Sequence, residues 1–378
     1  MSAAPRTDRV ARRWRGVGRA AMAVVLMLAS VRDGHAQAAV LLQGLADGEF
    51  WSTNARSNFL TRNGGSPATL GRVQLWGAYE PVSRLVFYAQ GELEGGDARR
   101  DIDNTDVYTD QFGVRYAAAR ALVVDAGRLT PVIGTFAPRR FSNRNPLIGE
   151  PDGYSLDYPE GVEASGEFPH FDYRAALVSL PATHEGYTPA PSRALRPAIG
   201  AGVTPFTGLR IGGSFTIGPY LNKLTNQALL AGKSWNDYDQ RLFAFDLAFS
   251  RGYLETHAEY AYGSYDVPGR PKSLTGVTYY GEAKYTFTPR FFLAARAERN
   301  RYPFIRPLTT TWIAKPTDFA DGEVGAGYRL RSKTLIKASV AADRWWVSPG
   351  GGFLGTGGRA FALQVSQEFD LMGLFERP

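Results

Sequence analysis

The chain has 378 residues, a formal net charge of +7 and no cysteine. The lack of cysteine excludes disulfide frameworks, thiolate metal sites and cysteine nucleophiles. Seven arginines but only two aspartates lie in the first 38 residues, so the remaining chain is close to neutral and basicity gives no argument for a nucleic-acid partner.

The first 38 residues have the order of residue types found in a secretion signal. An arginine-rich start is followed by an apolar run over residues 20–31 and then by Ala36, Gln37 and Ala38. Small residues after an apolar core are typical of a cleavage site, and the core is shorter than the roughly 20 residues of a membrane-spanning helix. We predict a signal peptide over residues 1–38 and an exported mature domain over residues 39–378.

From residue 39 onwards, apolar and polar residues alternate in segments of about ten residues, the length of a tilted strand that crosses a bilayer. In the segment 241–250, Phe243 and Phe245 fall on one face, while Ala244 and Asp246 fall on the other. A soluble β-sandwich would show the same alternation, so the connections between segments must distinguish the two folds.

Short and long connections follow one another in strict alternation along the chain. Short turns are expected near residues 81–83, 118–120, 169–170, 205–207, 251–252, 289 and 331–333. Long connections are expected near residues 52–69, 95–105, 130–158, 181–196, 219–237, 264–274, 303–319 and 347–357. Outer-membrane barrels combine tight periplasmic turns with long outer loops in this way. The pattern predicts an all-β fold, a transmembrane antiparallel up-and-down barrel of about 16 strands, with fourteen or eighteen as alternatives.

The third long connection, over residues 130–158, is the longest and carries charges of both signs. The residues that we single out there and at the preceding strand end are Arg128, Arg139, Arg140, Arg144, Glu150, Asp152 and Asp157. In position and length this segment resembles the constriction loop that general bacterial porins fold into the barrel. The resemblance implies that the loop arginines face carboxylates across the narrowest part of a pore, whereas a solvated outer loop is the alternative.

The strand exit Gly127-Arg128-Leu129-Thr130-Pro131 is also similar to a segment of phosphate-selective-type porins. The lysine-rich pattern expected of those porins is absent from this loop, so the resemblance does not extend to a phosphate preference. By analogy with porins of this shape, three copies would associate as a homotrimer.

Polar residues on the inner face of the strands are expected to line a water-filled lumen, because sixteen strands enclose an aqueous channel. These residues are Arg72, Glu92, Arg174, Arg210, Asp246, Glu259, Glu282, Lys284, Arg296, Glu298, Arg329 and Lys337, together with Gln74, Glu163, Glu255, Glu323 and Glu368. Both signs of charge occur, so the preference for anions or cations stays open, with the loop arginines favouring anions.

The sequence therefore predicts a porin in the outer membrane of a Gram-negative bacterium, for passive diffusion of small hydrophilic solutes or ions, without a cofactor or a metal. Other expected partners are outer-membrane lipid and the outer-membrane assembly machinery, which reads a last strand such as the one containing Phe361, Leu363 and Val365. An adhesin or structural anchor is one alternative. A barrel hydrolase is the other; it would use His257 as a base, but no nucleophile motif accompanies that residue.

Overall fold

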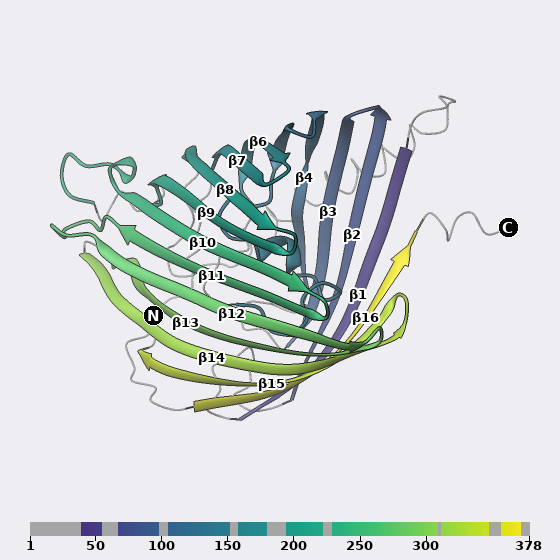
Figure 1. Ribbon diagram of the computed structural model, residues 1–378. Coiled ribbons are helices and arrows are strands. Elements are labelled where there is room, and N and C mark those ends of the chain that lie inside the picture. Colours follow the sequence, from purple (N-terminus) through teal and green to yellow (C-terminus); the bar gives the residue numbers. More distant parts are fainter. Residues whose placement is uncertain are drawn as a thin grey trace.

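Sixteen antiparallel strands close into one barrel in a computed structural model (Figure 1). The structure describes residues 39–54, 67–97, 105–151, 158–179, 194–221, 229–308, 311–347 and 357–371. The predicted all-β barrel and its strand number are confirmed. The expected signal peptide, residues 1–38, lies outside the described residues. Within the described ranges, no helix has the length and hydropathy needed to cross a bilayer.

Each strand pairs with its neighbours in sequence, and the barrel closes where the first strand meets the last. The strands are β1 (Ala39–Thr53), β2 (Ala68–Val82), β3 (Leu85–Gly96), β4 (Thr105–Ala119), β5 (Leu122–Arg128), β6 (Glu160–Phe168), β7 (Phe171–Val178), β8 (Arg196–Phe206), β9 (Leu209–Pro219), β10 (Asp239–Arg251), β11 (Leu254–Tyr265), β12 (Leu274–Thr288), β13 (Phe291–Leu308), β14 (Thr311–Arg331), β15 (Thr334–Val347) and β16 (Gly357–Asp370). Two single turns of 3-10 helix, η1 (Ala137–Arg139) and η3 (Trp235–Asp237), lie in long connections.

The closing pair, β1 and β16, runs in register from Gln43↔Asp370 to Thr53↔Ala360. Closure leaves no strand with a free row of backbone N–H and C=O groups inside the barrel wall. That is the condition for a sheet to survive in hydrocarbon, where no water is available to bond them.

All seven short turns and seven of the eight long connections lie within a few residues of their predicted positions. The predicted long connection over residues 303–319 is wrong. There, β13 and β14 continue as a two-stranded ribbon that pairs residues 302–308 with residues 311–317. β12 accompanies β13 only as far as Arg301, and β15 accompanies β14 only from Asp318. Among the residues that the structure describes, no strand pairs with the outer edges of this ribbon. Prolines are tolerated at such edges because their missing N–H breaks no ladder bond.

The distribution of exposure in the barrel wall is the reverse of that in a soluble protein. Phe245 and Val340 are 60% and 57% exposed on the outer face, whereas Gln74 and Lys337 are each 1% exposed on the inner face. A soluble sandwich would bury the apolar face and expose the polar one. The outer face instead suits lipid and the inner face suits water, as in outer-membrane barrels.

Aromatic side chains gather on the outer face near the short turns. Phe168, Phe171 and Tyr173 lie with ring centroids 6.2 to 6.5 Å apart beside one turn. Tyr285 and Phe287 are 4.8 Å apart beside another. Such rings suit the level of the lipid headgroups, so these turns mark one boundary of the membrane.

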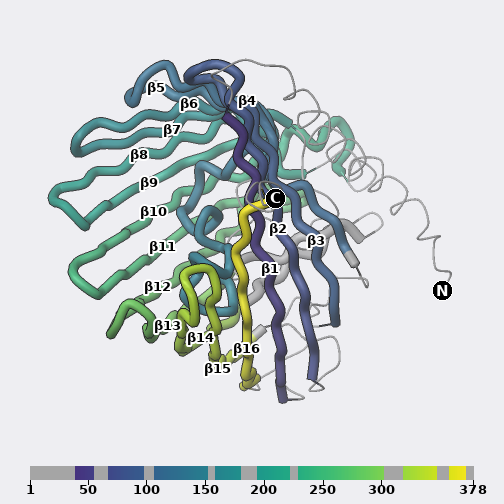
Figure 2. The backbone as a smooth tube through the Cα atoms, turned by 90° about the vertical axis from the view of Figure 1, so that its right-hand side faces the viewer, coloured from purple at the N-terminus to yellow at the C-terminus, as the bar shows by residue number. Residues whose placement is uncertain are grey.

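The barrel wall is uneven in height, and its lowest part determines where the third long connection begins. β14 has 21 residues, whereas β5 has only 7 (Figures 1 and 2). A tilted strand needs about 9 to 11 residues to cross the membrane, so the chain leaves β5 while still at membrane depth. Irregular backbone is not tolerated in contact with lipid there. The connection that follows must therefore turn into the barrel.

Gly127 makes this exit sterically feasible. Its φ is 143°, and a Cβ at this position would collide with the backbone oxygen of Phe112 on β4. A residue with a side chain would push the end of β5 away from its partner strand.

Candidate functional site

The described part of the connection between β5 and β6, residues 129–151 and 158–159, lies inside the barrel (Figure 2). Val132 packs on inward residues of β7 and β8, and Ile133 packs on inward residues of β10 and β11. Further along, Ile148 packs against β1, β2 and β16. Because β1, β2 and β16 lie across the barrel from strands β7 to β11, the loop crosses the bore rather than lining one side of it.

Side chains of the wall also bind main-chain atoms of this loop. Lys337 Nζ on β15 donates hydrogen bonds to the carbonyl oxygens of Asn145 (3.0 Å) and Leu147 (2.7 Å). Glu323 Oε1 on β14 accepts hydrogen bonds from the backbone N–H groups of residues 148–149, each at 3.1 Å. These contacts depend on the position of the loop backbone and not on its side chains, so they fix its path directly.

A second set of anchors holds the beginning of the loop. Arg174 on β7 donates to the carbonyl oxygens of Pro131 (3.1 Å) and Val132 (2.8 Å). On the other side, the carboxylate of Glu259 on β11 accepts hydrogen bonds from the hydroxyl (2.9 Å) and the backbone N–H (3.1 Å) of Thr135. The loop is therefore clamped at both ends of its course through the bore.

Two of the loop arginines singled out from the sequence form ion pairs with the wall. Arg139 Nη1 lies 2.8 Å from a carboxylate oxygen of Glu282 on β12. Arg140 Nη2 lies 2.9 Å from Asp110 on β4 and 3.2 Å from Glu92 on β3. The two side chains thus reach opposite parts of the wall, and each is paired there with a carboxylate.

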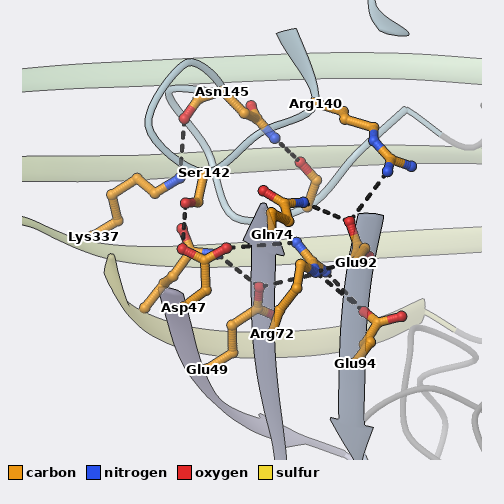
Figure 3. Close-up of polar contacts among 12 residues, drawn as sticks. Asp47, Glu49, Arg72, Gln74, Glu92, Glu94, Arg140, Ser142, Asn145 and Lys337 are labelled. Atoms are coloured by element: carbon orange, nitrogen blue, oxygen red, sulfur yellow. Dashed lines mark hydrogen bonds and ion pairs between the residues drawn. The ribbon is translucent and has the colours of Figure 1, made fainter. Parts of the chain in front are cut away.

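The region around Arg140 is rich in buried carboxylates (Figure 3). Arg72 on β2 donates a hydrogen bond to Glu94 at 3.0 Å and lies 3.5 Å from Glu92 and 3.9 Å from Asp47. The hydroxyl of Ser142 in the loop donates to Asp47. The wall over β1–β3 therefore attracts the cationic and hydroxyl groups that the loop presents to it.

A comparable network lies on the other side of the loop. Arg296 on β13 pairs with Glu282 (3.3 Å) and Glu323 (3.0 Å), and all three side chains are at most 3% exposed. Glu282 in turn holds Arg139, and Glu323 holds the loop backbone. Arg296 thus connects two of the contacts that position the loop.

Tyr158, near the end of the loop, is buried with its ring 5.3 Å from the guanidinium of Arg140. Burial raises the pKa of the Tyr158 hydroxyl to about 12. The phenol is therefore neutral at physiological pH and offers Arg140 a π face.

The other residues selected from the sequence differ in their contacts. Arg128 donates to the carbonyl oxygen of Tyr158 at 3.1 Å, whereas Arg144 is exposed and donates to the carbonyl oxygen of Pro138 at 3.1 Å. Glu150 is half-buried and interacts electrostatically with Arg72 and Arg140. Asp152 and Asp157 lie outside the described residues, so the expected position of the loop carboxylates stays a prediction.

The remaining lumen candidates point into the bore in small groups. Glu298 is buried, Lys284 lies 2.9 Å from Glu255, and Arg329 donates to the carbonyl oxygen of Ser332 at the short-turn end. Arg210 binds both Asp172 and Asp246.

Between the loop and one part of the wall lies a cavity of about 870 Å³. Its boundary runs along the loop at Gly134, Thr135, Pro138 and Arg139 and along inward residues of strands from β4 to β11. Three charged residues of this boundary were not selected from the sequence: Arg115, Arg120 and Asp172. The alternation along β4 places Arg115 on the inner face and could have identified it, whereas Arg120 lies in a turn, where no periodicity applies.

No family model matches the chain, and no curated protein matches its sequence. Solved structures, however, share its architecture. An anion-selective porin from Comamonas acidovorans superposes with a TM-score of 0.57 at 13% identity, over 88% of this chain and 100% of that chain. OmpF of Salmonella typhi, solved in complex with daunomycin, gives 0.57 at 12% identity, over 87% of this chain and 97% of that chain.

OmpT of Vibrio cholerae, an outer membrane protein solved in a trimer form, gives a TM-score of 0.54 at 14% identity, over 88% of this chain and 99% of that chain. Identities this low show the fold alone, and the resemblance to phosphate-selective porins stays a prediction. The chain has the closed sixteen-stranded barrel fold of bacterial outer-membrane porins.

Proposed function

We propose that the protein is an outer-membrane pore through which small hydrophilic solutes or ions diffuse passively. The observation that carries this proposal is a polar bore, closed by sixteen strands, that an internal loop crosses without filling. A barrel of this strand number is wide enough for an aqueous channel. The loop narrows that channel and sets the size of the solutes that pass.

In the proposed pore, the loop arginines have different roles. Arg139 and Arg140 tie the loop to Glu282 and Asp110, so their charges are locally balanced by the wall. Arg144 is exposed and adds a positive charge to the passage. Together with Arg128, Glu150, Asp152 and Asp157, these residues form the proposed constriction.

The proposed cellular setting follows from the same features. Residues 1–38 direct export, the assembly machinery recognises the last strand, and outer-membrane lipid surrounds the apolar face. The trimer form of a structural neighbour supports assembly of this chain as a homotrimer.

Solute flux into liposomes tests the proposed function. Purified protein in liposomes should admit a series of uncharged sugars at swelling rates that fall steeply with increasing sugar size, because the loop restricts the bore. Protein-free liposomes and liposomes that contain heat-unfolded protein are the controls. Folded protein that admits none of the sugars would contradict diffusion and favour a structural anchor.

The described residues give no support to the alternative of a barrel hydrolase. His257 faces the cavity from β11. Within the part of the chain that the structure describes, no serine hydroxyl is hydrogen bonded to it, so a Ser–His pair is not formed there.

A further inference from the structure

The cavity beside the loop differs in charge from the rest of the bore. It lies on the side of the loop nearer the short turns, since its wall includes turn residues such as Arg120 and Pro169. The arginines in its lining are Arg115, Arg120, Arg139, Arg174 and Arg210, and the acids are Glu167 and Asp172. A concave site lined mostly by one sign of charge concentrates ions of the opposite sign.

Most carboxylates that balance these arginines lie behind them and do not line the cavity. The side chain of Arg115 is 54% exposed, while that of its partner Asp125, at 2.9 Å, is 7% exposed. Arg210 is 27% exposed, while its partner Asp246 is 9% exposed; its other partner, Asp172, lines the cavity and is 28% exposed. In the pairs with Asp125 and Asp246 the cation is the more exposed member, so guanidinium groups outnumber carboxylates on the cavity surface.

The position of Arg210 depends on two glycines of the inner wall. A Cβ at Gly202 on β8 or at Gly212 on β9 would collide with the guanidinium group. The missing side chains let the guanidinium lie flat against the sheet, where Asp172 and Asp246 hold its ends. The cation is thereby fixed on the wall and leaves the space above it open.

Arg115 keeps hydrogen-bonding capacity for a ligand. Its Nε–H is used for Asp125, whereas its terminal nitrogens carry N–H groups in the planar arrangement that matches a carboxylate. The cavity volume of about 870 Å³ is within the range of roughly 300 to 1,000 Å³ typical of sites for small organic molecules. It is far larger than a single inorganic ion requires.

We infer that this cavity binds small organic anions that carry carboxylate groups, and that it is an intermediate binding site on their path through the pore. The inference rests on the proposed diffusion function and names the class of solute that the pore favours. Attraction to the guanidinium groups raises the local concentration of such anions, while the buried carboxylates behind them keep binding weak enough for release.

The test is the block of single-channel current by succinate in planar bilayers at low salt, with uncharged succinamide as the matched probe. We expect succinate to lower the current in a saturable manner and succinamide to have little effect. The double variant Arg115→Gln/Arg120→Gln should raise the half-blocking succinate concentration roughly tenfold, because two exposed cations are lost. Both side chains are largely solvated, so the substitutions leave the loop anchors intact.

Two further variants control for general charge effects. Glu167→Gln removes an exposed acid from the cavity and should lower the half-blocking concentration. Arg290→Gln removes an exposed cation from a short turn that does not line the cavity and should leave it unchanged. An equal block by succinamide, or a half-blocking concentration that is unaltered in the double variant, would overturn the anion site while leaving the pore in place. Folded protein without channels would refute the proposed function, and the anion site with it.

Discussion

Replacing residues 132–149 with a short Gly-Ser linker should raise the single-channel conductance several-fold and shift the ion preference toward cations. The conductance rises because the segment that crosses the bore is removed and a barrel of sixteen strands is wide when empty. The preference shifts because the deletion takes away Arg139, Arg140 and Arg144 while wall carboxylates such as Glu282 and Asp110 remain.

The two readouts are independent, since conductance reports width and the reversal potential in a salt gradient reports charge. Deletion of residues 230–233, which are exposed in the connection between β9 and β10, is the matched control and should change neither. If the variant without the internal segment conducts like the parent protein, the loop does not lie in the bore.

The substitution Arg296→Met should lower the free energy of unfolding by about 3 to 5 kcal/mol, because it removes a buried cation that two buried carboxylates share. Glu323 would lose this ion pair, and Glu282 would keep only its ion pair with Arg139. Since Glu323 also holds the loop backbone, the current through open channels should become noisier as well. Denaturant titration in detergent measures the first effect, and single-channel recording measures the second.

Two variants separate the network from a general effect of substitution on β13. Arg296→Lys keeps the charge and should recover part of the stability. Arg299→Met removes a cation that is 43% exposed and pairs with Asp318, so it should cost at most about 1 kcal/mol. Equal losses for the two methionine variants would show that the buried network does not carry the effect.

The strand number and the inner and outer faces could be predicted from the sequence because both depend on local periodicity. Two-residue alternation assigns Phe245 outward and Asp246 inward, and the alternation of short and long connections gives sixteen strands. The β13–β14 ribbon was not predicted, because prolines at positions 303, 307 and 316 read as loop signals. Only the pairing among the described residues shows that no strand pairs with the outer edges of this ribbon.

The contacts of the loop could not be predicted, because they join residues far apart in the chain. Arg139 and Glu282 are separated by 143 positions, and their meeting depends on the closure of the barrel and on the depth at which β5 ends. Composition placed arginines in the loop but could not indicate whether wall or loop carboxylates would bind them. Likewise, the carboxylates hidden behind Arg115 and Arg210 are apparent only from their exposure in the folded barrel.

A continuous water-filled passage beside the internal loop should make the folded barrel conduct ions. Purified, detergent-folded wild-type protein added to a planar bilayer should produce discrete current steps of uniform size whose conductance increases with salt concentration. Protein that inserts as a folded barrel yet gives no steps at any salt concentration would contradict the continuous passage.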